Sequence, residues 1–522
     1  MGKVSEASSW YQLLEPDRMP LNFFFLISVV IFIVYRKGVK RIKDTPSLPP
    51  GPRGLPVVGY LPFLRPDLHR CFADLAQTFG PLMTMWIGSR QCIIVSSSEA
   101  SMEVCRDHDA TFANHDTTAA ARIISFGAQD MVFQPYSPKW RTLRKVFVRE
   151  LLNTKILDSF HALRQREVRS MVEELHRKTG EVVDVGQVAF VTALNVVTAM
   201  LWGNSLAAEE RERVGGEFRE LVDGIVHLLG VTNMSDIFPV LEWMDLQGVQ
   251  QKMKEHKERL DRLLNMIIEQ RKGTLEASGD QKKTKDFLQV MLEMVKEDPH
   301  QLLTTDNIKG LFANIVLGGT DTTSTTVEWT LAEMMNKPET IRKAQEELES
   351  VVGKEEMVDE THLPKLHYLE ALVKESLRLH PPVPLLVPRY PTATSSIGGY
   401  MIPKGAKVFI NAWAIHRNPS VWENPSEFIP ERFLTGTNRW EYGGSNNFNF
   451  IPFGFGRRIC VGIPLAEKMN KYILATMLHS FEWRLPGNSK LDLVEKFGIV
   501  LKKEKPLVAI ATARPSCAKL NK

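Results

Sequence analysis

Apolar residues recur every three or four positions through most of the chain after about residue 98, and charged residues fill the positions between them. The segments SFHALRQREVRSMVEELHRK and EHKERLDRLLNMIIEQRK show this period clearly. A period near 3.6 residues is typical of helices that bury one face. The pattern therefore predicts a protein built mainly from α-helices.

Shorter apolar runs interrupt this helical pattern near both ends of the chain. Residues 81–97 read as two strands joined at Gly88 and Ser89, and further strands are expected in residues 400–413 and 481–510. The expected fold class is mainly α with small β-sheets, or α+β. No internal repeat is evident in the sequence.

One run near the N-terminus carries no charge at all. Residues 19–35 read MPLNFFFLISVVIFIVY, slightly shorter than the ~20 residues of a typical membrane span. Five basic residues follow closely, which places the rest of the chain in the cytosol by the positive-inside rule. A cleaved signal peptide would carry its charges before the run and a small-residue cleavage site after it. A buried helix is the other alternative, and the flanking charges disfavour it.

The run divides the chain into four expected parts. Residues 1–18 form a short lumenal N-terminus and residues 19–35 a transmembrane anchor. Residues 36–56, which contain PSLPPGPRGLP, form a basic and Pro-rich hinge, because proline favours stiff, extended backbone. Residues 57–522 form the globular domain.

Composition excludes several classes of protein. The chain has 522 residues, 43% of them hydrophobic, and a net charge of +4 without a basic footprint for nucleic acid. Its five cysteines show neither C-x-x-C nor zinc-like spacing, which suits a reducing compartment. The sequence contains no G-x-G-x-x-G after a strand and no phosphate-binding P-loop, so the chain has no evident nicotinamide or flavin domain of its own.

The segment TTDNIKGLFANIVLGGTDTTSTTVEWTLAEMMNKP suggests one long central helix from Thr304 to Pro338. Its middle, GGTDTT, is costly in a helix, because each glycine costs about 1 kcal/mol relative to alanine. One interpretation is functional: the glycines make room for a ligand, while Asp321 and Thr322 supply an acid and an alcohol for proton relay. The other is a loop that splits the segment into two helices.

Near the C-terminal end, FGFGRRICVG concentrates glycines, arginines and a cysteine in ten positions. Closely spaced glycines indicate a sharply bent or closely approached backbone. Arg457 and Arg458 are expected to draw the thiol of Cys460 toward thiolate. Such a thiolate is suited to metal binding or nucleophilic chemistry.

Two weaker patterns place a charged residue and a possible partner on the same face of a helix. Glu375 and Arg378 lie three residues apart, and Arg432 of the PERF segment can join them if the fold brings it near. Trp140 and Arg144 lie one helical turn apart, a pair that suits a planar anionic ligand but is equally ordinary between core and surface.

Together these motifs, in this order, resemble the cytochromes P450 over nearly the whole chain. The motifs on which the resemblance rests are W-x-x-x-R, G-G-x-D-T-T, Glu-x-x-Arg, P-E-R-F and F-x-x-G-x-R-x-C-x-G. The anchor and Pro-rich hinge resemble the microsomal members, and the C-terminal segment EKFGIVLKKEKPLVAIATARPS resembles plant enzymes that oxidise terpenoids or phenolics. The resemblance implies the family fold, with a long central helix and a haem-binding cysteine loop.

The resemblance also assigns roles to residues. Cys460 binds the iron of haem b as an axial thiolate, which is both the metal ligand and part of the cofactor site. Asp321 and Thr322 deliver protons during oxygen activation, and Glu375, Arg378 and Arg432 form a structural network behind the haem. Gly456 and Gly462 let the loop approach the porphyrin, Phe453 packs beside it, and the propionates are held by Trp140, Arg144, Arg389 and Arg458.

The implied reaction is monooxygenation of a small apolar molecule. We expect a sesquiterpene or other terpenoid as substrate, with a flavonoid or phenolic compound as the alternative. Asn114, His115 and Thr117 are candidates for bonding flavonoid hydroxyls. The implied pocket lining is small and aliphatic: Ala313, Leu317, Gly318, Leu386, Val387, Ile499 and Val500.

The implied partners are a separate NADPH–cytochrome P450 reductase, with cytochrome b5 as a further candidate, and membrane lipid. Arg457, Lys468 and Lys471 lie near the cysteine in sequence and are candidates for docking an acidic partner. The expected location is the endoplasmic reticulum membrane, crossed once, with the catalytic domain in the cytosol.

Two functions of other classes stay open. A haem-thiolate isomerase or dehydratase works without reductase, and the intact Asp321–Thr322 pair argues against it. A non-catalytic binder of apolar ligands would lack a haem Soret band.

Overall fold

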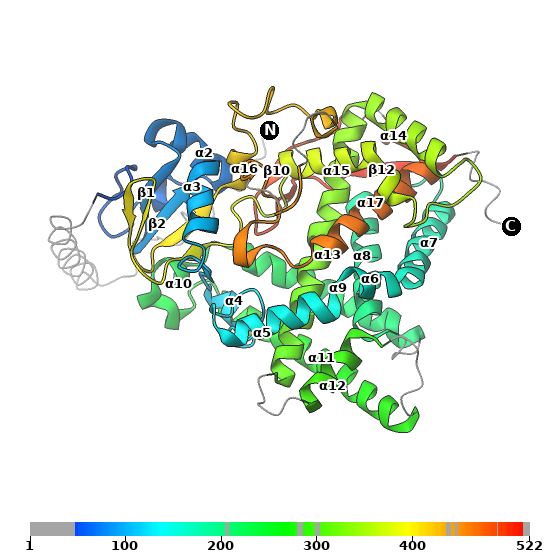
Figure 1. Ribbon diagram of the computed structural model, residues 1–522, viewed down its shortest axis with the longest axis horizontal. Helices are drawn as coiled ribbons and strands as arrows, with labels where there is room; N and C mark the ends of the chain where they lie inside the picture. Colours follow the sequence, from blue (N-terminus) through cyan, green and yellow to red (C-terminus); the bar gives the residue numbers. More distant parts are fainter. Residues whose placement is uncertain are drawn as a thin grey trace, which may run out of the picture.

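Helix α13 (Thr305–Asn336) runs through the middle of the protein, shown in green in Figure 1. The computed structural model describes residues 47–203, 208–278, 285–297, 303–434, 440–443, 447–487 and 489–514. Thr304 caps the helix in a capping box with Asn307, and the helix ends just before Pro338. At 1.5 Å per residue it is about 48 Å long. It is one continuous helix, so the interpretation of GGTDTT as a loop between two helices is wrong.

Five helices pack most extensively against α13 and bury most of it, with α12 (Phe287–Glu297) making a smaller contact. They are α8 (Val185–Trp202), α9 (Ala208–Gly230), α14 (Pro338–Val351), α15 (His367–Leu379) and α17 (Ile463–Ser480). Burial among these helices outweighs the poor helix propensity of the GGTDTT segment, which explains why the helix continues through it.

The remaining helices surround this group (Figure 1). They are α2 (Leu68–Phe79), α3 (Ser98–Met102), α4 (Ala119–Ile124), α5 (Pro138–Val146), α6 (Thr154–Ser159), α7 (His161–Arg177), α10 (Met234–Ile237), α11 (Val249–Ser278), α12 (Phe287–Glu297) and α16 (Ala412–Ile415). The short helical turns are η2 (Leu61–Phe63), η3 (Glu103–Asp107), η4 (Phe147–Leu151), η5 (Pro239–Met244), η6 (Leu363–Lys365), η7 (Pro430–Phe433) and η8 (Gly456–Arg458).

The largest sheet has five strands in the order β1-β2-β8-β5-β3. β1 (Leu82–Ile87) and β2 (Arg90–Val95) form the predicted hairpin around Gly88 and Ser89, and β8 (Lys407–Ile410) runs parallel to β2. Alternate residues of β2 enter two different apolar clusters, which is why the sheet is buried on both faces. The two remaining strands are β5 (Arg389–Tyr390) and β3 (Asn114–His115).

Three smaller sheets complete the described part of the chain. One has the order β4-β12-β9, and the other two are the hairpins β6-β7 and β10-β11. Their bounds are β4 (Val182–Asp184), β6 (Ser395–Ile397), β7 (Tyr400–Ile402), β9 (Phe481–Arg484), β10 (Glu495–Lys496), β11 (Lys502–Lys503) and β12 (Val508–Ala513). The mainly helical fold with small sheets is therefore confirmed.

The predicted membrane anchor, residues 19–35, lies outside the described residues. Within those residues, α8 is long and apolar enough to cross a membrane. Most of it is buried inside the protein against α13, so it is a core helix.

Candidate active site

Cys460 lies in a loop that leads directly into the N-terminus of α17. The backbone N–H of Cys460 donates to the Phe453 carbonyl over 3.0 Å, which closes the loop. The N–H of Gly462 donates to the cysteine Sγ over 3.3 Å. Phe453 itself packs against the Tyr442 ring, with 4.8 Å between centroids. The loop therefore fixes the sulfur at the start of a helix, where the helix dipole favours negative charge.

The charges around Cys460 differ from the sequence-based expectation. Desolvation by the surrounding protein raises the pKa of its thiol, although Cys460 keeps solvent-accessible surface, and the Gly462 N–H and the Arg144 charge offset this only in part. Arg457 pairs with Asp109 and Arg458 donates to backbone carbonyls, so neither draws the thiol toward thiolate as predicted. Arg457 and Arg458 are successive residues of the η8 turn and point in different directions, and the cation that acts on the sulfur comes from α5. A bound metal would remove the thiol proton outright.

Gly456 is required by a close approach within the protein. Its φ is +73°, and a Cβ there would lie 2.2 Å from the carbonyl oxygen of Cys105. The glycine thus allows the cysteine loop to approach the chain at residues 105–109, and its predicted role beside the porphyrin stays a prediction. At Gly462, φ is −81° and a Cβ would make an ordinary 3.6 Å contact with the Cys460 sulfur.

Three arginines and a tryptophan gather beside this loop. The guanidinium of Arg458 lies 4.4 Å from the Trp140 ring centroid, and that of Arg144 lies 5.5 Å from it. Arg144 donates to the Ile459 carbonyl over 3.0 Å, and Arg389 donates to the Phe455 carbonyl over 2.8 Å. Burial and the charges of Arg389 and Arg144 lower the pKa of Arg458 to about 9. This mutual repulsion makes the cluster receptive to an anion.

The members of this cluster differ in the donors they have left. Arg458 donates to the carbonyls of Ala113, Met131, Val132 and Gln134, and the Trp140 indole donates to Met131. Among the described residues, Nη1 of Arg389 is buried without a hydrogen-bond partner and lies 3.5 Å from the Asp109 carboxylate. Arg389 therefore offers an unused buried donor, whereas Arg458 and Trp140 mainly order the backbone around the site.

The middle of α13 is more open than the rest of that helix. Gly318 is exposed and its neighbours Leu317 and Gly319 are half-buried, whereas Val316 and Thr320 are buried. A Cβ on Gly318 would meet no atom within 4 Å. The hydroxyl of Thr322 donates to the Gly318 carbonyl over 2.6 Å, one turn away. The helix thus presents a short strip of bare backbone with an ordered hydroxyl beside it.

Asp321 has a partner that the sequence did not indicate. Its buried Oδ1 lies 2.6 Å from Nζ of Lys502, on β11. Burial raises the pKa of the Asp321 carboxyl, and the Lys502 charge partly offsets this. Local patterns cannot connect residues so distant in the chain, so no sequence feature pointed to Lys502.

Glu375, Arg378 and Arg432 form one buried network. Arg378 contacts both oxygens of Glu375, at 2.7 and 2.8 Å, and Nε of Arg432 lies 3.1 Å from the same carboxylate. Arg378 also donates to the carbonyls of His416, Pro425 and Glu427. The network joins α15 to the segment before η7, so its arrangement is structural.

The predicted substrate-contact segments converge on α13. The Leu501 N–H donates to the Pro382 carbonyl over 2.8 Å, and Trp329 of α13 donates to the Leu501 carbonyl over 3.0 Å. Leu386, with φ +50°, lies 3.8 Å from the position of a Cβ on Gly454 in the cysteine loop. Half-buried residues of these segments are Leu317, Leu386, Val387 and Ile499, while Ala313 and Val500 are buried.

Asn114 and His115 each use one polar atom to hold the backbone of the same segment. Asn114 accepts the Tyr136 N–H over 2.7 Å, and Nδ1 of His115 lies 2.7 Å from the Val132 carbonyl. Both side chains are buried, at 5% and 8% exposure. These bonds hold the segment around residues 132–136, and the bonding of substrate hydroxyls by the two residues stays a prediction. Thr117 is half-buried, and its hydroxyl lies 3.5 Å from the His115 carbonyl.

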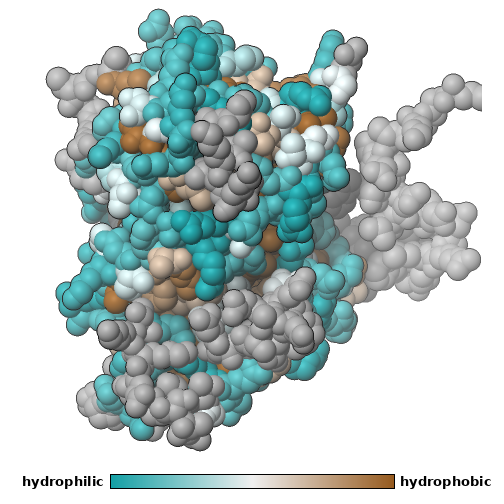
Figure 2. Space-filling model, turned by 90° about the vertical axis from the view of Figure 1, so that its right-hand side faces the viewer, coloured by the Kyte–Doolittle hydropathy of each residue, from teal (hydrophilic) through white to brown (hydrophobic). Residues whose placement is uncertain are grey.

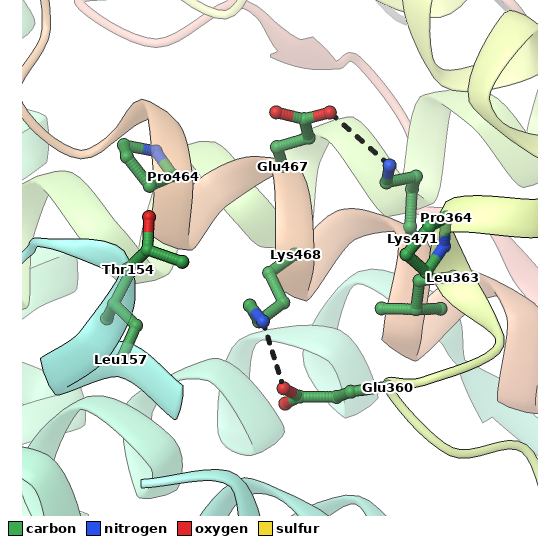
Figure 3. A pocket seen from close by; sticks show the side chains of 9 residues that line it. All are labelled: Thr154, Leu157, Glu360, Leu363, Pro364, Pro464, Glu467, Lys468 and Lys471. Carbon is green, nitrogen blue, oxygen red and sulfur yellow. Dashed lines mark hydrogen bonds and ion pairs between the residues drawn. The ribbon is translucent and has the colours of Figure 1, made fainter. Parts of the chain in front are cut away.

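Lys468 and Lys471 line a surface pocket together with acidic residues (Figure 3). Lys468 lies 3.1 Å from Asp158 and 3.3 Å from Glu360. Lys471 is buried and lies 3.3 Å from both Glu370 and Glu467. Neither lysine presents a free charge, which weakens the expectation that they receive an acidic partner.

These features fit the haem expected from the sequence. The donor set offers a thiol at a helix N-terminus, an unused buried guanidinium N–H for a carboxylate, and a strip of α13 that lacks side chains. Among the described residues, no group of three or more His, Cys, Asp or Glu side chains offers an alternative metal site.

Comparison with known proteins gives one consistent family. A sequence model of the cytochrome P450 family matches residues 49–510. A flavonoid 3'-monooxygenase of Crocosmia x crocosmiiflora is 39% identical over 94% of this chain and 97% of its own length. A flavonoid 3',5'-hydroxylase of Solanum melongena is 36% identical over 94% of this chain and 96% of its own, and cytochrome P450 76C2 of Arabidopsis thaliana is 37% identical over 95% and 98%.

Solved structures agree with this result. A zebrafish cytochrome P450 determined with progesterone has a TM-score of 0.72 and 27% identity, covering 86% of this chain and 100% of that chain. A second zebrafish structure, determined with abiraterone, has a TM-score of 0.71.

Proposed function

Because the chain belongs to the cytochrome P450 family, we propose that it is a haem-thiolate monooxygenase whose substrate is a flavonoid or a related plant phenolic. Family membership carries the monooxygenase class, a haem held by a cysteine thiolate, O2 as co-substrate and NADPH electrons from a separate reductase. The observation that carries the substrate class is the 39% identity to a flavonoid 3'-monooxygenase over 94% of the chain. This favours the phenolic alternative over the terpenoid expectation.

When bound, the haem supplies an iron centre that activates O2, so that one oxygen atom enters the substrate and the other leaves as water. Cys460 would hold the iron, and its position at the start of α17 with the Gly462 N–H on its sulfur stabilises the thiolate. Arg389 and Arg144 would hold the haem carboxylates, because they belong to a cluster of cations that repel one another, and the Asp109 carboxylate near Arg389 is shared with Arg457. Trp140 and Arg458 would order the backbone under them.

Asp321 and Thr322 would manage protons. The Thr322 hydroxyl is fixed by its bond to the Gly318 carbonyl, at the exposed strip of α13. The Asp321 carboxylate lies one residue earlier on the helix and is buried. Because neighbouring residues of a helix do not face each other, a proton would pass from the Asp321 carboxyl to the Thr322 Oγ1 through water and onward into the site.

A flat substrate would lie against the bare strip at Gly318. The lining contributed by Leu317, Leu386 and Ile499 is aliphatic, so shape and not hydrogen bonding would position the ring system. The same apolar lining favours a terpenoid as the second candidate.

The test expresses the chain with a plant reductase in yeast microsomes and supplies NADPH with a panel of flavonoids, monoterpenes and sesquiterpenes. A flavonoid that gains one oxygen only with NADPH, and not with Cys460→Ala, supports the proposal. Oxidation of terpenoids alone would establish the second candidate. A haem Soret band without any oxidation on the panel would direct the test to oxygenated substrates without reductase, as for an isomerase.

The proposed location is the endoplasmic reticulum membrane, with residues 1–18 lumenal, 19–35 spanning the bilayer, 36–56 forming the hinge and 57–522 forming the cytosolic catalytic domain. Exposed apolar side chains support this where the described chain begins. Leu55, Phe63 and Trp86 are each about half exposed. Next to them, η5 and the residue pair after it expose Val240 (84%), Trp243 (81%) and Leu246 (55%).

The two parts of this apolar surface are connected. Ser89, in the turn between β1 and β2, donates to the Ile237 carbonyl at the end of α10. By contrast, the face that includes α7 and α14 is mainly hydrophilic, with apolar residues in small separate patches (Figure 2). Protease added to intact microsomes should digest the catalytic domain, and protection of that domain would contradict the proposed orientation.

A further inference from the structure

Lys502 is the cation that contacts the proposed proton-relay acid in the part of the chain that the structure describes. Its Nζ lies 2.6 Å from Oδ1 of Asp321, whose side chain is only 3% exposed, whereas the Lys502 side chain is 39% exposed. Oδ2 of Asp321 is buried and has no hydrogen-bond partner among the described residues. Lys502 therefore holds Oδ1 from the solvent side, and Oδ2 is the oxygen that remains to take up and release a proton.

The backbone on either side of this contact is firmly held. The residue before Lys502 is bonded at both its N–H and its carbonyl, to Pro382 and Trp329. The residue after it, Lys503, is buried and stacks over the Trp329 ring at 4.7 Å. Lys502 thus has a fixed backbone position, from which its side chain reaches Asp321 across the face of α13.

Electrostatics give this contact a consequence for protonation. Burial raises the pKa of Asp321, Lys502 lowers it, and Asp223 of α9 raises it again. Lys502 also acts on Glu328, two turns further along α13. Removing the ammonium would leave a buried carboxylate near a second carboxylate, an arrangement that favours the neutral acid.

We propose that Lys502 is a positioning residue for proton delivery: it orients Asp321 through Oδ1 and keeps its carboxylate ionised until a proton is passed. This rests on the proposed function, because it concerns how the relay acid of a monooxygenase is kept ready. Each transfer would move one proton from solvent to Asp321, from Asp321 to Thr322 and on into the site, and it would return Asp321 to the carboxylate. Lys502 gains and loses no proton in this sequence.

The experiment compares Lys502→Met, which removes the charge, with Lys502→Arg, which keeps it, in the haem-loaded full chain. The control is Lys505→Met, which removes an exposed cation that pairs with Asp492 and not with Asp321. The first measurement is difference infrared spectroscopy against pH. The protonated-carboxyl band of Asp321 is the one that Asp321→Asn removes, which separates it from the band of Glu328.

We expect the Asp321 band to appear at higher pH in Lys502→Met than in the unsubstituted protein, and to return to its original pH range in Lys502→Arg. An unchanged band in Lys502→Met would overturn the proposal. This measurement needs no substrate, so its result stands even if the microsomal panel shows that the proposed substrate class is wrong.

The second measurement is the amount of hydrogen peroxide released for each NADPH consumed. The rest of the NADPH is used to form product or water. Lys502→Met should release more peroxide for each NADPH, with a pH dependence that follows the infrared band, and Lys502→Arg should restore the ratio. If Lys502→Met, Lys502→Arg and Lys505→Met all raise the peroxide released for each NADPH by the same amount, Lys502 has only a general structural role and the proposal fails.

Discussion

Replacing Glu328 by glutamine should stabilise the protein, and the gain should grow with pH. Glu328 lies on α13, is 7% exposed and accepts the Leu507 N–H over 2.7 Å. Burial raises the pKa of its carboxyl from 4.5 to about 7, and the Leu507 bond and nearby lysines offset this only in part. Glutamine keeps an oxygen for the Leu507 N–H and cannot ionise.

The sign and size follow from linkage between protonation and folding. The folded state binds the Glu328 proton more tightly than the unfolded chain does. The contribution of this proton to the free energy of unfolding is therefore complete below pH 4.5 and is lost as the pH rises through 7. At about 1.36 kcal/mol per pKa unit, an ionisable carboxyl at this site lowers the free energy of unfolding by about 2 kcal/mol at pH 6 and by about 3 kcal/mol at pH 8, relative to its value at low pH. Glu328→Gln should therefore gain roughly 1 kcal/mol more over the original protein at pH 8 than at pH 6.

Denaturant titration of the haem-loaded protein, followed by circular dichroism at both pH values, measures this difference. Glu370→Gln is a control of opposite sign: burial raises the pKa of Glu370, but Lys374 and Lys471 outweigh burial and lower it. That control should lose stability at neutral pH. A gain for Glu328→Gln that does not change with pH, or a loss at pH 8, would falsify the assignment of Glu328 as a buried, strained carboxylate.

Three further substitutions test the scaffold. Arg378→Lys should cost about 3 kcal/mol or more, because lysine cannot reproduce the fork that contacts Glu375 and three carbonyls; a loss below about 1 kcal/mol in thermal unfolding would contradict this. Gly456→Ala should lower the unfolding temperature because its Cβ meets the Cys105 carbonyl at 2.2 Å, whereas Gly462→Ala should fold normally; equal effects would refute the comparison. Thr304→Ala should cost about 1 kcal/mol by removing the cap of α13, and no change would show that the cap is dispensable.

The fold could be predicted where local patterns decide it. The hairpin of β1 and β2 follows from β-branched and apolar residues around Gly88 and Ser89, and the ends of α13 follow from Thr304 and Pro338. The continuity of α13 through GGTDTT could not be decided from sequence, because propensity is local whereas burial against α8 and α17 is not.

The site divides in the same way. The cysteine motif located Cys460, and Arg432 contacts Glu375 at 3.1 Å, as the motifs suggested it can. A lowering of the Cys460 thiol pKa was predicted from Arg457 and Arg458, whereas the cation that acts on the sulfur is Arg144 and it only partly offsets the rise caused by desolvation, because proximity in sequence does not give side-chain direction. The Lys502–Asp321 contact depends wholly on tertiary structure.

The two backbone hydrogen bonds of Leu501 separate the turn before it from the Lys502–Asp321 contact after it. The turn at Ile499 and Val500 precedes a residue that is held at both its N–H and its carbonyl, to Pro382 and Trp329. Substitutions in the turn can therefore reshape the proposed substrate wall while Lys502 keeps its contact with Asp321. Under the proposed roles, new substrate preferences could evolve, or be engineered, without rebuilding the supply of protons.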